Sequence, residues 1–169
     1  MEEKFKFTTE ELAELHRIAT HLKTTMGDTL EPDDENYLRQ QLTKEIGDNK
    51  IKRDVFGLNP ILLSFQTAEL ELAEIGMKRE CVLAILLYNS IINGILSLEE
   101  VEHKFGRSVA QIIHGLVRIH ELYQRTPIIE SENFRNLLLS FAEDMRVILI
   151  MITDRVNLMR QIRDTTNKE

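Results

Sequence analysis

Tryptophan is absent from this sequence of 169 residues, and cysteine, proline and glycine are scarce. The single cysteine, Cys81, excludes an internal disulfide and a cysteine-based metal site, and its apolar helical surroundings predict a small buried side chain. Seven glycines and three prolines are too few for the many turns of a β protein, so the composition favours helices.

Long apolar runs and a surplus of positive charge are also missing. No stretch approaches the ~18 apolar residues of a membrane span, and the N-terminal MEEKFKFTTEEL has no apolar signal core, so we expect a soluble, cytoplasmic protein without membrane contact. The formal net charge of −7 argues against direct nucleic-acid binding, because such binding neutralises phosphates with cations. The length and the 43% hydrophobic content suit one domain spanning residues 1–169.

Signals for helix starts recur along the chain and predict an all-α fold. Thr8 and Glu11 have the spacing of a capping box, and Asn59 precedes Pro60 in the order expected of a cap and a first helical residue. About eight helices are predicted, over residues of about 9–22, 33–46, 60–75, 79–93, 98–105, 108–123, 132–142 and 144–163.

Two of these helices carry further expectations. Asp33 or Asp34 is expected to cap the second helix. The last helix contains VILIMI, which is apolar all round and therefore predicts a central, buried position.

Side chains that commonly carry chemistry form no recognisable catalytic pattern. A glycine-rich phosphate loop, a GxSxG elbow and a HExxH pair are all missing from the sequence. We interpret the five histidines as surface or partly buried side chains: His16, His21, His103, His114 and His120. Asp154 and Arg155 follow VILIMIT inside the helix predicted to be buried, where an unpaired charge is costly. The pattern favours a structural ion pair or hydrogen-bond network there over a ligand role.

Three segments nevertheless have a familiar order and spacing: SLEEVEHKFGRSVAQIIHGL, ENFRNLLLSFAEDMRVILI and DRVNLMR. With their surroundings, over residues of about 55–163, they resemble the N-terminal hydrolase domain of the RelA/SpoT family of alarmone enzymes. Proteins of that family make and degrade guanosine tetra- and pentaphosphate. The resemblance implies the helical HD fold and a site for a Mn²⁺-type ion.

The same resemblance implies a degenerate active site. Asn59 stands where the family has its first metal-binding histidine, Tyr88 and Asn89 where it has a His-Asp pair, and Ile92 and Asn93 where it has a catalytic Glu-Asp pair. Beyond these, the last metal-binding aspartate and its arginine are kept, whereas three polar positions that follow are changed; these residues are Asp154, Arg155, Asn157, Leu158 and Gln161.

Such replacements leave little metal chemistry at these positions. A divalent cation that generates hydroxide wants imidazole and carboxylate ligands, of which only Asp154 remains. Tyr88 would have to lose a proton with a pKa near ~10 to bind a metal well. We therefore expect no cofactor, with the Mn²⁺ site lost, and we expect Asn59, Tyr88 and Asn89 to converge on a buried Asp154.

The function implied is that of a catalytically inactive (p)ppGpp hydrolase-like HD domain. It would be the N-terminal regulatory or scaffolding part of a RelA-like GTP pyrophosphokinase, with the synthetase domain of the same parent chain as its partner and with weak or absent guanine-nucleotide binding. A stand-alone pseudoenzyme that binds another protein is an alternative, and so is an active metal-dependent hydrolase with atypical ligands. The sequence leaves the oligomeric state open.

Overall fold

The computed structural model describes residues 5–74, 79–125 and 145–167, and within these ranges the backbone is helical with no strand. The all-α prediction is therefore confirmed. The described elements are α1 (Thr9–Met26), the 3₁₀ turn η1 (Gly27–Thr29), α2 (Pro32–Gly47), α3 (Pro60–Glu74), α4 (Arg79–Ile92), α5 (Leu98–Phe105), α6 (Arg107–Arg125) and α8 (Met145–Asn167). The helix predicted over about 132–142 lies outside the described residues.

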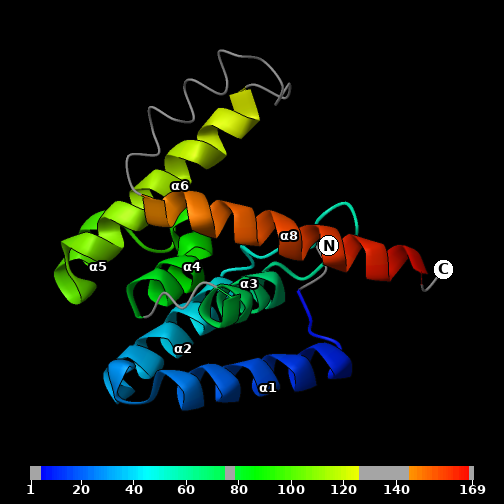
Figure 1. Cartoon of the computed structure of the whole chain (residues 1–169), viewed down its shortest axis with the longest axis horizontal. Coiled ribbons are helices and arrows are strands. Elements are labelled where there is room, and N and C mark those ends of the chain that lie inside the picture. Colours follow the sequence, from blue (N-terminus) through cyan, green and yellow to red (C-terminus); the bar gives the residue numbers. More distant parts are fainter. Residues whose placement is uncertain (1–4, 75–78, 126–144, 168–169) are drawn as a thin grey trace.

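Helices α3 and α4 form the middle of the molecule. In Figure 1, α8 crosses one side of this pair and α1 lies on the opposite side, while α5 and α6 stand at one end. Helix α4 packs against α2, α3 and α6, and α3 packs against α1 and α8. Leu83 and Leu87 of α4 are completely buried, and Cys81 is buried beside them, as predicted.

Local capping sets where most helices begin. The predicted capping box of α1 is confirmed: the Glu11 N–H donates to Thr8 Oγ1 at 3.1 Å, and the Thr8 N–H donates to Glu11 Oε1 at 2.9 Å. The predicted cap of α3 is confirmed as well, since Asn59 Oδ1 accepts from the Ile61 N–H at 3.0 Å. The N–H of Glu100 donates to Ser97 Oγ at 3.2 Å and so begins α5.

The start of α2 was predicted wrongly. Its cap is Glu31, because Pro32 occupies the first helical position, where its fixed φ suits a helix and its missing N–H costs nothing. Asp34 is then the third residue of the helix and accepts from the Glu31 N–H at 3.2 Å. The predicted caps, Asp33 and Asp34, therefore lie within the first turn.

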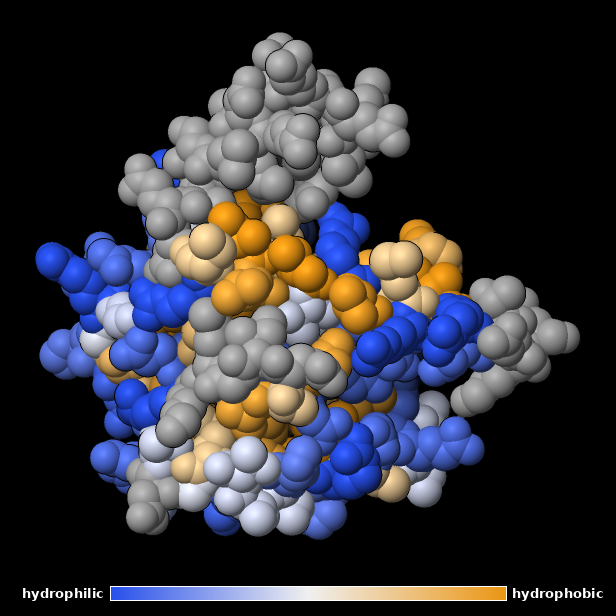
Figure 2. Space-filling model, in the orientation of Figure 1, coloured by the Kyte–Doolittle hydropathy of each residue, from blue (hydrophilic) through white to orange (hydrophobic). Residues whose placement is uncertain are grey.

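Helix α8 is buried along one face only. Val147 and Ile150 are 1% and 3% exposed, whereas Ile152, Val156 and Met159 are exposed by 51%, 37% and 69%. Figure 2 shows the resulting apolar surface over α8. The prediction of a fully buried helix is wrong because α8 packs on α3, α4 and α6 from a single side. In the part of the chain that the structure describes, no helix combines the length and apolar character needed to span a membrane.

Candidate functional site

A pocket of about 280 Å³ opens where α3, α4, α6 and α8 meet. Each of the four helices contributes to its wall, and the lining is mainly aliphatic with polar groups from α3, α4 and α8. Its lining residues are Ser64, Thr67, Ile85, Tyr88, Leu116, Ile119, His120, Ile150, Met151, Asp154, Arg155 and Leu158.

Asp154 is the carboxylate of this pocket. Thr67 Oγ1 donates to Asp154 Oδ1 at 3.2 Å. Partial loss of hydration inside the protein raises the pKa of the Asp154 carboxyl. The hydrogen bond from the Thr67 hydroxyl and the positive charge of Arg155 lower it. The residue is nevertheless exposed, so the expectation of a buried Asp154 is wrong. Removing Asp154 would take away the acceptor of the Thr67 hydroxyl, which belongs to a residue only 1% exposed.

Tyr88 faces the same pocket from α4. Burial raises the pKa of the Tyr88 hydroxyl, and the nearby negative charge of Asp154 raises it further. The side chain therefore stays a neutral phenol at physiological pH. The ring of Tyr88 meets the ring of His120 edge to face, with centroids 6.1 Å apart. Sequence reasoning missed His120 as a wall residue, although its place one turn after Leu116, on the apolar side of α6, was a signal.

Asn59 and Asn89 do not converge on Asp154, contrary to the prediction. Asn59 is 3% exposed and its Oδ1 caps α3, while its Nδ2 finds no hydrogen-bond partner in the described structure. Asn89 Nδ2 donates to Ser64 Oγ at 2.7 Å. Of the three predicted neighbours, Tyr88 alone lines the pocket with Asp154, and Asn89 reaches it only through Ser64.

Ile92 and Asn93 lie at the end of α4, away from the pocket lining. Asn93 Nδ2 donates to Glu45 Oε2 at 3.1 Å, and the Ser90 hydroxyl donates to the other oxygen of the same carboxylate. Glu45, from α2, is only 4% exposed, and it lines a second cavity of about 270 Å³ with Asn89 and Asn93. Ile92 is 37% exposed. No motif in the sequence indicates that Glu45 pairs with this end of α4.

The three changed positions on α8 have different surroundings. Asn157 is buried and its Nδ2 donates to the Leu63 carbonyl at 3.2 Å, while Gln161 Nε2 donates to Asn157 Oδ1 at 3.3 Å. Leu158 adds apolar surface to the pocket that holds Asp154. Two of the three side chains thus tie α8 to α3 or to itself, and only Leu158 faces the pocket.

The described helices and their pocket match a known domain. A model of the HD domain matches residues 56–169, from the turn before α3 to the C-terminal residue of the sequence. The chain belongs to the HD-domain family. The first two helices, α1 and α2, precede the matched region.

Relatives of this HD domain act on guanosine nucleotides, according to their names. The chain is 34% identical over 98 residues to guanosine-3′,5′-bis(diphosphate) 3′-pyrophosphohydrolase of Aquifex aeolicus, over 58% of this chain and 14% of that protein. It is 33% identical over 92 residues to the bifunctional (p)ppGpp synthase/hydrolase SpoT of Escherichia coli, over 54% of this chain and 13% of the relative. It is 32% identical over 85 residues to GTP pyrophosphokinase rsh of Brucella ovis, over 49% and 11%.

These alignments show homology to the (p)ppGpp hydrolases of the RelA/SpoT group and confirm the resemblance inferred from the motifs. The chain spans about one seventh of the length of the curated relatives that it matches.

The donor set of this HD domain fits a divalent metal poorly. At the pocket, Asp154 offers one carboxylate and His120 one imidazole, Ser64 and Thr67 offer neutral hydroxyls, and the phenol of Tyr88 resists ionisation. Among residues 5–74, 79–125 and 145–167, no three His, Cys, Asp or Glu side chains come together as a metal site would require. A Mn²⁺-type ion prefers several charged oxygens or imidazoles, so the residues of this pocket are poorly suited to metal-dependent hydrolysis.

Proposed function

We propose that this chain is a catalytically inactive relative of the (p)ppGpp hydrolases, a helical HD domain with a regulatory or scaffolding role. The observation that carries the proposal is the lining of the Asp154 pocket. The lining offers one carboxylate, Asp154, and one imidazole, His120, beside Arg155, Tyr88 and aliphatic side chains. Hydrolysis of a pyrophosphate would need a metal-activated water, and one carboxylate with one imidazole is too few ligands to hold that metal.

The role that we propose is conformational. The name of one relative, SpoT of Escherichia coli, joins synthase and hydrolase activities in one protein, and the relatives are much longer than this chain. In a RelA-like GTP pyrophosphokinase of the cytoplasm, a rigid helical body such as this one would pack on the synthetase domain of the same parent chain and bias its active state.

We expect the purified chain to release no pyrophosphate from guanosine tetraphosphate, with or without Mn²⁺. The reason is the combination of a neutral Tyr88 with a single carboxylate at the pocket. Thin-layer chromatography of labelled nucleotide, with Escherichia coli SpoT as the positive control, measures the rate. A metal-dependent rate of pyrophosphate release well above that in buffer, and lost in Asp154→Asn, would instead support an active hydrolase with atypical ligands.

We also expect guanosine tetraphosphate to bind no more tightly than about 1 mM, which is about 4 kcal/mol of affinity. The carboxylate of Asp154 repels phosphate and offsets the positive charge of Arg155 beside it, and Leu158 offers no hydrogen bond. Calorimetric titration at low salt is the demanding test, because electrostatic attraction is least screened there. Micromolar binding would mean that the pocket senses the nucleotide, and the purely scaffolding role would then be abandoned.

A stand-alone protein-interaction module is the second candidate function. The exposed apolar residues Ile152, Val156 and Met159 follow one another at helical spacing on α8, and such a face commonly marks a contact surface. In the first function this face would meet a domain of the same parent protein, and in the second a separate protein. A parent gene that encodes a synthetase domain in the same reading frame would exclude the second.

A further inference from the structure

A third cavity, larger than the two described above, lies away from the Asp154 pocket, between α1 and α2. Its volume is about 430 Å³, within the range typical of small-molecule sites. Helix α1 packs on α3, and α2 packs on α4, so the two helices leave a groove between them. Both walls precede residue 56, where the match to the HD domain begins. The two walls therefore lie outside the matched domain, whereas Phe65, Val82 and Leu86 of α3 and α4, which complete the lining, lie within it.

Apolar side chains line this groove along its length. Leu12, Leu15 and Leu22 come from α1, and Leu38 and Leu42 come from α2. Leu12 is 53% exposed, and Leu15, Leu38 and Leu42 are partly exposed, so the apolar surface is open to a ligand. On α1 the lining runs from residue 12 to residue 22, which is about 15 Å at the rise of an α-helix.

The charged residues of the lining favour an anionic head group. Lys23 Nζ lies 3.1 Å from Glu35 Oε2, and Arg39 Nη2 lies 3.2 Å from Glu35 Oε1, so two cations share one carboxylate. This local excess of positive charge stands out on a chain whose formal net charge is −7.

The shape of the groove decides what kind of molecule fits. The ion pair between Lys23 and Glu35 joins α1 to α2 across the groove. A partner helix, about 10–12 Å in diameter with its side chains, needs a wider opening, whereas an extended alkyl chain does not. A second copy docking through the apolar face of α8 is disfavoured by charge, because Arg155, Arg160 and Arg163 on that helix would approach Lys23 and Arg39.

We propose that this groove binds a free alkyl carboxylate of medium or long chain, with its tail between α1 and α2 and its head group beside Lys23 and Arg39. The leucine side chains remove the alkyl tail from water, which supplies most of the affinity. The cations contribute less, since exposed ion pairs are weak. This site is separate from the Asp154 pocket and does not depend on the proposed function.

Calorimetric titration of the full chain with dodecanoate, below its micellar concentration, tests the proposal. The key variant is Ala19→Phe, because Ala19 is exposed, lines the groove and can be enlarged without disturbing the core. Ala13→Phe is the matched control, since Ala13 is exposed on the same helix but does not line the groove. Displacing about two methylenes from the groove should weaken dodecanoate binding about tenfold in Ala19→Phe. Ala13→Phe should bind as the original chain does.

Head-group preference is tested with dodecylamine, which has the same tail and the opposite charge. Dodecanoate should bind about threefold more tightly than dodecylamine. That preference should disappear in Arg39→Gln and persist in the control Lys44→Gln, which changes an exposed residue outside the groove.

Several results would overturn the proposal. The first is the absence of any heat of binding when dodecanoate is added. The second is dodecanoate binding that is weakened equally in Ala19→Phe and Ala13→Phe, and the third is dodecylamine binding more tightly than dodecanoate. Sedimentation that shows self-association lost in Ala19→Phe would identify a second copy as the occupant instead. Displacement of dodecanoate by a synthetic amphipathic helix that binds more tightly would identify a partner helix.

Discussion

Replacing Glu71 by methionine is expected to raise the free energy of unfolding by about 3 kcal/mol at pH 8. Glu71 is completely buried in α3, and neither of its carboxyl oxygens has a hydrogen-bond partner in the described structure. Burial raises the pKa of this carboxyl from 4.5 to about 7. The folded state therefore disfavours the charged form, and methionine has a similar length without any charge to bury.

The expected gain depends on pH in a definite direction. Below 4.5 the carboxyl is protonated in the folded and unfolded chains alike, so it adds no electrostatic penalty. Between 4.5 and about 7 the unfolded chain ionises while the folded chain stays neutral, and stability falls as pH rises. Above about 7 the penalty is complete. At 1.36 kcal/mol for each pKa unit, the shift corresponds to about 3 kcal/mol.

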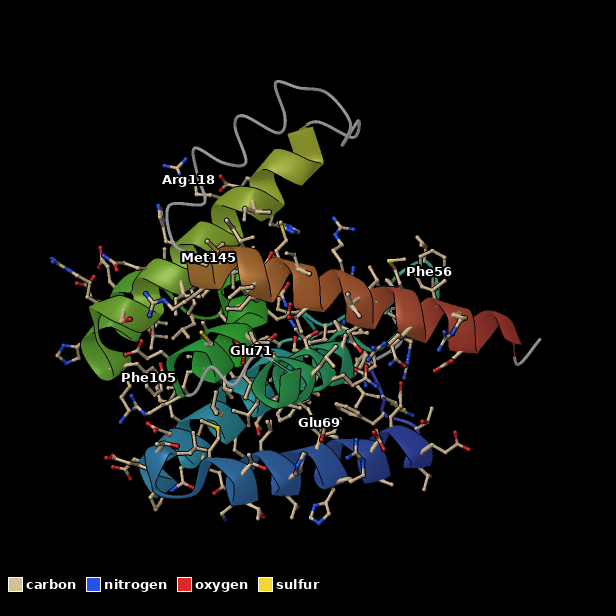
Figure 3. All side chains as sticks on the ribbon, in the orientation of Figure 1. Phe56, Glu69, Glu71, Phe105, Arg118 and Met145 are labelled. Carbon is tan, nitrogen blue, oxygen red and sulfur yellow. The ribbon has the colours of Figure 1, made fainter. Side chains whose placement is uncertain are left out.

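Urea unfolding at pH 5 and pH 8 measures this effect. Glu71→Met should gain most of its advantage only at pH 8, and Glu71→Gln should likewise flatten the pH dependence. Glu69, two residues earlier, is the matched control, because it faces α1 in Figure 3 and pairs with Arg17 at 3.0 Å and His21 at 2.8 Å. Its pKa is lowered, so Glu69→Gln should destabilise slightly at pH 8. Two results would contradict this account. One is a free energy of unfolding of Glu71→Met below that of the original chain at both pH values, and the other is a difference between the two chains that is the same at pH 5 and pH 8.

The helices could be predicted from the sequence because their signals are local. The Thr8 side chain accepts a hydrogen bond from the N–H of Glu11, three residues away, and the Asn59 side chain accepts one from the N–H of Ile61, two residues away. Such caps can be predicted without knowledge of the fold. The start of α2 was not predicted correctly, because two local signals compete there. Pro32 at the first position prevailed over the acidic pair that follows it.

The site was harder to predict because its contacts join residues far apart in the chain. Thr67 and Asp154 are 87 positions apart, and Glu45 and Asn93 are 48 apart. Homology pointed to positions on α3, α4 and α8, of which Tyr88, Asp154, Arg155 and Leu158 line the pocket, but it did not point to α6. It could not indicate that Asn59 and Asn89 stay away from Asp154, nor that Asp154 is exposed. An apolar run such as VILIMI predicts burial, but α8 meets its neighbours on one side only, and that depends on the packing of three other helices.

The crossing of α6 and α8 depends on a glycine. A Cβ atom added at Gly115 would lie 3.3 Å from Val147 Cγ1 and only 2.7 Å from Val147 Cγ2, and the second distance is closer than Cβ atoms approach in real proteins. Val147 is 1% exposed and β-branched, so its side chain has little freedom to move aside. The absence of a side chain at position 115 therefore lets the two helices come together at this point.

Gly115→Ala is accordingly expected to destabilise the chain by about 1 to 3 kcal/mol, the usual range for overpacking a core. The sign should reverse once the obstacle is removed. In a Val147→Ala background, Gly115→Ala should stabilise by up to about 1 kcal/mol, because alanine is the better helix former. Gly47→Ala at the end of α2, where an added Cβ would meet nothing within 4 Å, is the control and should not destabilise. A double-mutant cycle followed by urea unfolding measures the coupling. Additive effects of the two substitutions would show that α6 and α8 do not meet at Gly115 and Val147.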